Sequence, residues 1–244
     1  MADRKGPVGI VLAAAAVAVW LGVTHHDPGD LLAGAEHVVA DLRPTTTQDP
    51  TPAPSTHPVD VAAVEAALAS LPVKGRAPKT GYSREQFGPA WADVDHTGCD
   101  QRNETLARGM TNLTFKPGTH DCVVLTGTLA DPYTGTTIDF RRGEDTSSAV
   151  QIDHRVPLAN AWVTGAQQWD AGKREQFAND PANLIAVDGP TNASKGDGDA
   201  ATWLPPNKAY RCDYVAAQVD VKAKYRLWVT QAEHDAIARI LDRC

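Results

Sequence analysis

The sequence predicts an α+β domain with few strands, preceded by an export segment and a stalk. Three observations lead to this class: helical spacing of apolar residues after residue 59, a β-branched run that turns back on itself near residue 130, and a last third of helical composition. Of the 244 residues, 42% are hydrophobic and 22% are charged, as in ordinary globular proteins. The length allows one full domain plus additional segments.

Residues 1–35 have the pattern of an export segment. Two basic residues precede an apolar run over residues 8–23, which is shorter than the about 20 residues of a full membrane span and suits a secretory signal. Two interpretations stay open: a signal peptide cleaved near Ala-Gly-Ala at 33–35, or an uncleaved signal anchor with its basic end inside. Either one predicts a protein that is secreted or anchored to the outer face of the cytoplasmic membrane.

Residues 36–58 predict a linker. Eleven of the fifteen residues from Pro44 to Pro58 are Pro, Thr or Ser, and such a stretch buries too little apolar surface to offset its ordering entropy. The folded domain is therefore expected over residues 59–244.

The formal charge of −7 argues against a wholly basic nucleic-acid-binding face. Residues 1–60 hold three basic and seven acidic side chains, and the rest of the chain holds 20 basic and 23 acidic ones. The predicted domain is thus close to neutral, and the objection to a nucleic-acid substrate weakens.

The elements of the domain follow from local patterns. Apolar residues recur at helical spacing from Val61 to Leu71, ahead of Pro72. A short helix is expected over 103–110, and strands over 122–129 and 136–140 are expected to form a hairpin around a Pro- and Gly-containing turn.

The last hundred residues predict two further strands among helices. Short strands are expected over 150–154 and 183–187, and helical composition covers 162–177 and 207–225. Thr230 and Glu233 have the spacing of a capping box, in which the two residues satisfy free N–H groups at a helix start.

Four cysteines lie in the predicted domain, and no two have the CxxC spacing of a zinc knuckle. An even number in an exported domain suggests two disulfides, for which three pairings are possible. We favour Cys99–Cys122 and Cys212–Cys244, because each joins near neighbours along the chain and the second ties down the C-terminus.

The densest set of polar residues lies between positions 153 and 197. Asp153 and His154 end an apolar run, Asn183 opens NLIAV, and Asn192 opens NASKGD. A carboxylate beside a histidine often occurs by chance, so that pair alone indicates little. The informative feature is the order of the three segments.

That order resembles the HNH, or His-Me finger, nuclease superfamily with its ββα-metal core. The matching segments are IDHRVPL at 152–158, NLIAV at 183–187 and NASKGD at 192–197. A wider likeness through much of 74–244 is similar to exported bacterial HNH endonuclease-family proteins, which are related to the C-terminal nuclease domain of a modification-dependent restriction enzyme. The resemblance implies a ββα-metal core at about residues 150–200, with added helices and the hairpin.

The resemblance implies a metal-dependent endonuclease that hydrolyses phosphodiester bonds, with DNA as the expected substrate and RNA as an alternative. His154 is the expected general base, because a neutral imidazole can take a proton from water near physiological pH. Asp153 and Asn192 supply oxygen ligands suited to one divalent cation, with Mg²⁺ preferred and Mn²⁺ as an alternative. Asn183 is expected to brace the loop around the histidine.

Three basic residues are candidates for contacts with substrate phosphate: Lys195, Arg155 and Arg142. For Lys195, a solvated surface lysine is an equally good interpretation.

Other chemistries have less support. The sequence lacks a GxSxG elbow, a P-loop, a dinucleotide fingerprint and an HExxH motif. The alternative to a nuclease is a non-catalytic exported domain of the same fold that binds a molecule at the cell envelope. Membrane contact is expected only through an uncleaved N-terminal segment, and no protein partner can be inferred.

Overall fold

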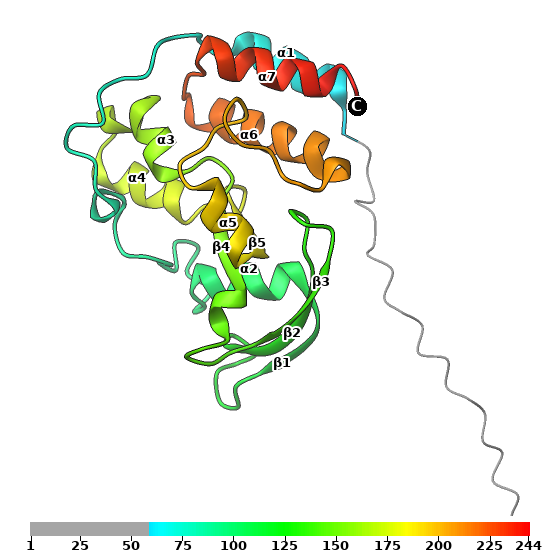
Figure 1. The fold of residues 1–244 in the computed structure, drawn as a ribbon. Coiled ribbons are helices and arrows are strands. Elements are labelled where there is room, and N and C mark those ends of the chain that lie inside the picture. The colour runs from blue at the N-terminus through cyan, green and yellow to red at the C-terminus, as the bar shows by residue number, and fades with distance from the viewer. Residues whose placement is uncertain (1–58) are drawn as a thin grey trace, which may run out of the picture. The chain divides into compact units, whose positions relative to one another are not determined.

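A computed structural model of the chain describes residues 59–244. The described part contains seven α-helices and five strands in two small antiparallel sheets (Figure 1), which confirms the α+β class. The predicted export segment (1–35) and linker (36–58) lie outside the described residues. Within residues 59–244, none of the helices has the length and apolar composition that a membrane crossing requires.

Three helices pack together at one end of the domain: α1 (Val61–Ser70), α6 (Arg211–Tyr225) and α7 (Gln231–Leu241) (Figure 1). The apolar spacing of α1 places Val64 and Leu68 in the core beneath it. The predicted cap at Thr230 starts α7, because its side chain accepts a hydrogen bond from the Glu233 N–H at 3.1 Å.

A three-stranded sheet forms the opposite end of the domain. Helix α2 (Gln101–Gly109) runs directly into β1 (Met110–Phe115), and β1 pairs with the hairpin of β2 (Val124–Ala130) and β3 (Thr137–Arg141). The predicted hairpin is confirmed. Strand β1 is an addition, because MTNLTF follows the helix without a turn signal to mark its start.

The centre of the domain holds a second sheet and a short helix (Figure 1). Strands β4 (Val150–His154) and β5 (Leu184–Asp188) are antiparallel, with Val150 opposite Asp188 and His154 opposite Leu184. Helix α5 (Gly189–Lys195) follows β5 without a connecting loop. The order strand, strand, helix thus brings residues 153, 154 and 192 into one region.

The connection between β4 and β5 contains two helices, α3 (Leu158–Val163) and α4 (Ala171–Ala178). The helical composition of 162–177 is therefore divided between them. Gly165 separates the two helices with φ +138°, a conformation that side-chain-bearing residues rarely adopt. Helices α3 and α4 lie on the side of β4 and β5 away from β1–β3 (Figure 1).

Three hydrophobic clusters form the core. One lies under α1, α6 and α7, the second lies between α3, α4 and the end of α6, and the third lies between α2 and the strands. Each cluster contains large side chains that are fully buried: Tyr133 and Tyr214 in the first, Phe87 and Phe177 in the second, and Leu106 and Leu184 in the third.

Two disulfides close the fold, and both have the predicted pairing. Cys99 is bonded to Cys122 and Cys212 to Cys244, with Cα–Cα distances of 5.5 and 5.9 Å. The first bond joins the start of α2 to the loop before β2, and the second joins α6 to the residues after α7.

We expect each disulfide to stabilise the domain by about 3–4 kcal/mol, because loops of 23 and 32 residues are closed in the unfolded chain. Urea unfolding of the Cys99→Ala/Cys122→Ala and Cys212→Ala/Cys244→Ala variants measures each loss. A reducing agent should lower the stability of the wild type by a similar amount per bond. Unchanged stability under reduction would contradict the expectation.

Candidate active site

Strand β4 places Asp153 and His154 at the centre of the domain. Because side chains alternate along a strand, Gln151 and Asp153 point to one face and His154 points to the other. Pairing with β5 buries both Asp153 and His154 almost completely. The Asp153 carboxylate and the His154 imidazole therefore lie on opposite faces at the end of β4.

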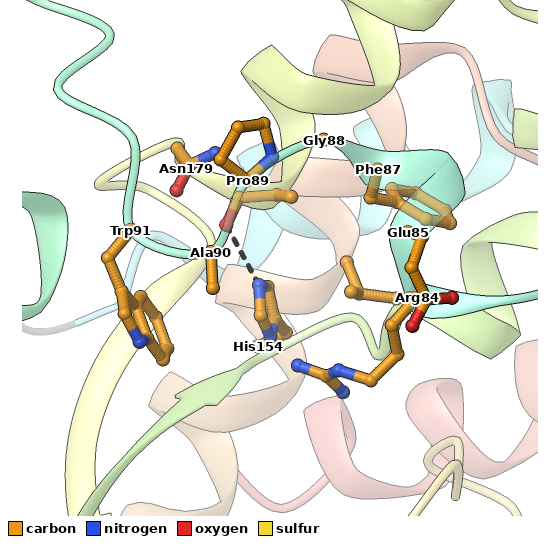
Figure 2. A pocket seen from close by; sticks show the side chains of 11 residues that line it. Arg84, Glu85, Phe87, Gly88, Pro89, Ala90, Trp91, His154 and Asn179 are labelled. Carbon is orange, nitrogen blue, oxygen red and sulfur yellow. Dashed lines mark hydrogen bonds between the residues drawn. The ribbon is translucent and has the colours of Figure 1, made fainter.

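The His154 imidazole is held in a defined orientation. Its Nε2 lies 2.8 Å from the Ala178 carbonyl oxygen at the end of α4 (Figure 2), and its ring lies nearly parallel to that of Trp91, with centroids 6.2 Å apart. A carbonyl oxygen can only accept a hydrogen bond, so Nε2 is the protonated nitrogen and donates. In the neutral ring, Nδ1 therefore carries the free lone pair. Burial lowers the pKa of His154 from 6.5 to about 4, although the Ala178 carbonyl and Asp153 oppose the shift.

The Asp153 carboxylate is bound by two donors. The Tyr133 hydroxyl donates to Oδ2 at 2.5 Å, and the Lys195 ammonium group lies 2.6 Å from the same oxygen. The Lys195 ammonium also donates to the His154 carbonyl oxygen at 2.6 Å. Burial lowers the pKa of Lys195 below its usual value, and the negative charge of Asp153 opposes this shift without reversing it.

The structure buries one of the three basic candidates and places the other two away from His154. The Lys195 side chain is 0% exposed and is paired with Asp153, so it is not a solvated surface lysine, and a contact with substrate phosphate would require this pair to open. Arg142 donates to the Val124 carbonyl and the Asn103 side chain behind the β2–β3 hairpin. Arg155 donates to the Ala182 carbonyl and lies beside α6, on another face of the domain.

Helix α5 brings Asn192 back to strand β4. The helix begins against the backbone of residues 147–149, and a Cβ at Gly189 would collide with the Ser148 carbonyl oxygen. The Asn192 side-chain nitrogen donates to Gln151 Oε1 at 2.9 Å. This bond orients the Asn192 carboxamide and leaves its oxygen for another partner.

Asn183 lies fully buried behind the histidine. Its Oδ1 accepts from the Val156 N–H at 2.9 Å, and its own carbonyl accepts from the Arg155 N–H at 2.8 Å. These bonds fix the turn that follows His154.

A polar cleft of about 380 Å³ brings the three main candidates together. Asp153, His154 and Asn192 all line it. The other lining residues include Arg84, Trp91 and Arg102, which the sequence analysis did not assign to the site. Arg84 and Trp91 lie in the segment GYSREQFGPAW at residues 81–91, but nothing in their spacing indicates which residues of the segment would reach the cleft.

The donor set fits a hard divalent cation that keeps most of its water. Among residues 59–244 there is no cluster of three or more His, Cys, Asp or Glu side chains able to hold a metal. Two carboxylates line the cleft, Asp153 and Asp197, together with the orientated carboxamide of Asn192. The Asp197 carboxylate is paired with Lys79 and its side chain is 57% exposed, which leaves Asp153 and Asn192 as the candidate pair of ligands. Mg²⁺ is commonly held by one or two carboxylates, several waters and substrate phosphate, so this pair is sufficient.

The fold and the cleft define a disulfide-linked α+β domain that gathers a carboxylate, a histidine and a carboxamide at one polar site. Residues 100–240 match the family described as GmrSD restriction endonucleases, C-terminal domain, and the chain belongs to this family. An "Uncharacterized secreted protein" of Arthroderma benhamiae is 38% identical over 199 residues, which cover 80% of this chain and 92% of that protein. No solved structure matches significantly. Membership indicates a nuclease-type function and a nucleic-acid substrate.

We expect the buried ion pair to matter far more for stability than an exposed one. Lys195→Met leaves the Asp153 charge buried without its cation, and we expect a loss of about 3–5 kcal/mol. Lys79→Met removes the exposed pair with Asp197, side chains that are 54% and 57% exposed, and should change stability by about 0–1 kcal/mol. Urea unfolding measures both, and equal effects would contradict the assignment.

The low pKa of His154 predicts a pH-dependent stability in the presence of a chelator. Unfolded His154 takes up a proton near pH 6.5, whereas the folded protein takes it up only near pH 4. The unfolded state therefore binds more protons between these values, and stability falls as the pH falls through that window, by roughly 3 kcal/mol in total. His154→Gln should remove this component from urea unfolding curves recorded between pH 4 and 7.5. An equally steep pH dependence in the variant would refute it.

Proposed function

We propose that this protein is a metal-dependent endonuclease of the His-Me finger type, with β4, β5 and α5 as its ββα-metal core. The observation that carries the proposal is the meeting of Asp153, His154 and Asn192 in one polar cleft. The family match supports phosphodiester hydrolysis as the reaction. DNA is the proposed substrate, with RNA as the alternative.

His154 is the proposed general base. Its Nε2–H is engaged by the Ala178 carbonyl, so Nδ1 is the atom that takes a proton from the attacking water. The low pKa keeps the ring neutral at the pH of most environments, which means that the base is ready before substrate arrives. The water oxygen then attacks phosphorus, and the 3′ oxygen of the substrate leaves.

Asp153 and Asn192 are the proposed ligands of one divalent cation, Mg²⁺ or Mn²⁺. When bound, the cation supplies charge neutralisation at the phosphate and stabilisation of the leaving oxygen. Lys195 and Tyr133 hold the Asp153 carboxylate in place from behind. They act as positioning residues rather than as phosphate contacts.

Arg84 and Arg102 are the proposed phosphate contacts, in place of Lys195, Arg155 and Arg142. Both line the cleft that contains His154. The Arg84 side chain is exposed, whereas Arg102 is half-buried and donates to the Ser147 carbonyl at 3.5 Å. Two guanidinium groups in an otherwise near-neutral domain give a local attraction for a phosphate backbone without a wholly basic face.

Secretion is the proposed location, in keeping with the name of the Arthroderma benhamiae relative and with the two disulfides. The proposal includes cleavage of residues 1–35 as a signal peptide and a linker at residues 36–58. That the family is a bacterial one stays a prediction.

Plasmid cleavage tests the proposal. The protein with Mg²⁺ or Mn²⁺ should nick supercoiled DNA, a chelator should stop the reaction, and His154→Ala should lower the rate by about 10²–10⁴-fold, the usual contribution of a general base. Asn192→Ala should also lower the rate. The matched control is His234→Ala, which removes a histidine from α7 outside the cleft.

Equal nicking by wild type and His154→Ala would reject His154 as the base. No cleavage of DNA or RNA with either metal would instead favour the non-catalytic binding domain.

A further inference from the structure

A second cavity opens beside the histidine. This apolar recess, of about 300 Å³, lies between residues 84–91 and the ends of α3 and α4 (Figure 2). It shares four lining residues with the polar cleft: Arg84, Trp91, His154 and Leu158. The two cavities therefore meet at the His154 ring.

The chemistry of the recess differs from that of the cleft. Its walls are mostly aromatic and aliphatic, formed by Phe87, Pro89, Ala90, Trp91 and Leu158. Polar groups are few, with Arg84 and Glu85 on one side and Asn179 on the other (Figure 2). Asn179 is buried and donates to the Glu175 carbonyl at 3.0 Å, so its carboxamide oxygen stays available as an acceptor. Apolar walls with a few fixed polar groups are typical of small-molecule sites, for which about 300 Å³ is the lower limit of size.

Trp91 presents a flat surface at the junction. Its ring lies within 14° of the plane of the His154 ring. Its φ of +61° is a conformation that bulky residues rarely adopt and that concentrates at binding and catalytic sites. The Gln101 N–H donates to the Trp91 carbonyl at 3.3 Å and helps to hold this backbone conformation.

We propose that the apolar recess binds the nucleobase of a nucleotide next to the phosphate that is cut. The inference rests on the proposed nuclease function and specifies its substrate. When a phosphate lies in the polar cleft near His154, the adjoining base lies close to the recess, which opens at the same histidine. The base is also the one flat, largely apolar part of a nucleotide, and it therefore fits the apolar walls. Aromatic walls stack on any base, and Arg84 lies where it can contact both the base and the phosphate.

The proposal has a consequence for the form of nucleic acid that is cut. A base inside the recess cannot remain stacked in a duplex, so the nucleotide must come from a single strand or rotate out of the helix. Single-stranded or locally opened nucleic acid is therefore the preferred substrate.

Binding in the presence of a chelator tests the recess without any cleavage. Calorimetric titration compares deoxyadenosine 5′-monophosphate with 2-deoxyribose 5-phosphate, which carries the same phosphate but no base. The base should tighten binding at least about fivefold, the lower end of base–aromatic stacking. Ala90→Trp, which fills the recess, and Trp91→Leu, which removes its flat wall, should each abolish this difference.

Two matched controls carry the same exchanges elsewhere. Ala66→Trp adds an indole on the exposed side of α1. Trp228→Leu removes an indole that donates to the Gly75 carbonyl. Neither residue lines the recess or the cleft. Both should keep the preference for the base. Equal binding of the two probes to the wild type, or no binding of either, overturns the proposal.

A cleavage assay separates this inference from the proposed function. Single-stranded oligonucleotides that carry either a normal or an abasic nucleotide beside the cut should differ in rate at least fivefold, in favour of the normal one. Cleavage that depends on His154 but is equal for both substrates refutes the recess and leaves the nuclease intact. Base-dependent binding without any cleavage keeps the recess and rejects the nuclease.

Discussion

A buried contact between an ammonium group and a carboxylate joins three separate parts of the domain. Lys195 comes from α5 and Asp153 from β4, and the Tyr133 hydroxyl from the β2–β3 turn donates to the same carboxylate oxygen. Displacing α5 or β4 would leave a charge without its partner in a medium that solvates it poorly, and displacing the β2–β3 turn would remove a hydrogen-bond donor from the carboxylate. The contact therefore fixes α5 along β4, and with it Asn192, which lies one helical turn before Lys195.

Tyr133 extends this constraint into the hydrophobic core. Its ring lies against those of Trp203, Tyr210 and Tyr214, with centroids 5.1, 6.1 and 5.9 Å away. Burial raises its pKa well above the usual value, so the hydroxyl keeps its proton and continues to donate. The Tyr133 side chain thus links the hydrophobic core under α6 to the Asp153 carboxylate of the site.

Much of the fold could be predicted from the sequence because its patterns are local. Helix α1, the β2–β3 hairpin and the cap of α7 each depend on residues within a few positions of one another. The order of Asp153, His154 and Asn192 was similarly visible. Burial was not: Lys195 looks like any lysine before a glycine, and only the approach of α5 to β4 encloses it. Arg84 and Trp91 reach the cleft across more than sixty residues of sequence, a relation that spacing cannot show.

The packing of α1 has a consequence for how the domain assembles. Residues 61–70 lie against α6 and α7, and Val73 forms a parallel bridge with Val229, so the two ends of the described chain close on each other. Contacts of such long sequence separation require a large loss of loop entropy before they stabilise anything, which slows folding. A chain emerging from its N-terminus cannot bury α1 until residues 211–241 have followed. The central sheet and helices α3 and α4 can form earlier, but the packing of α1 against α6 and α7 is a late event in folding.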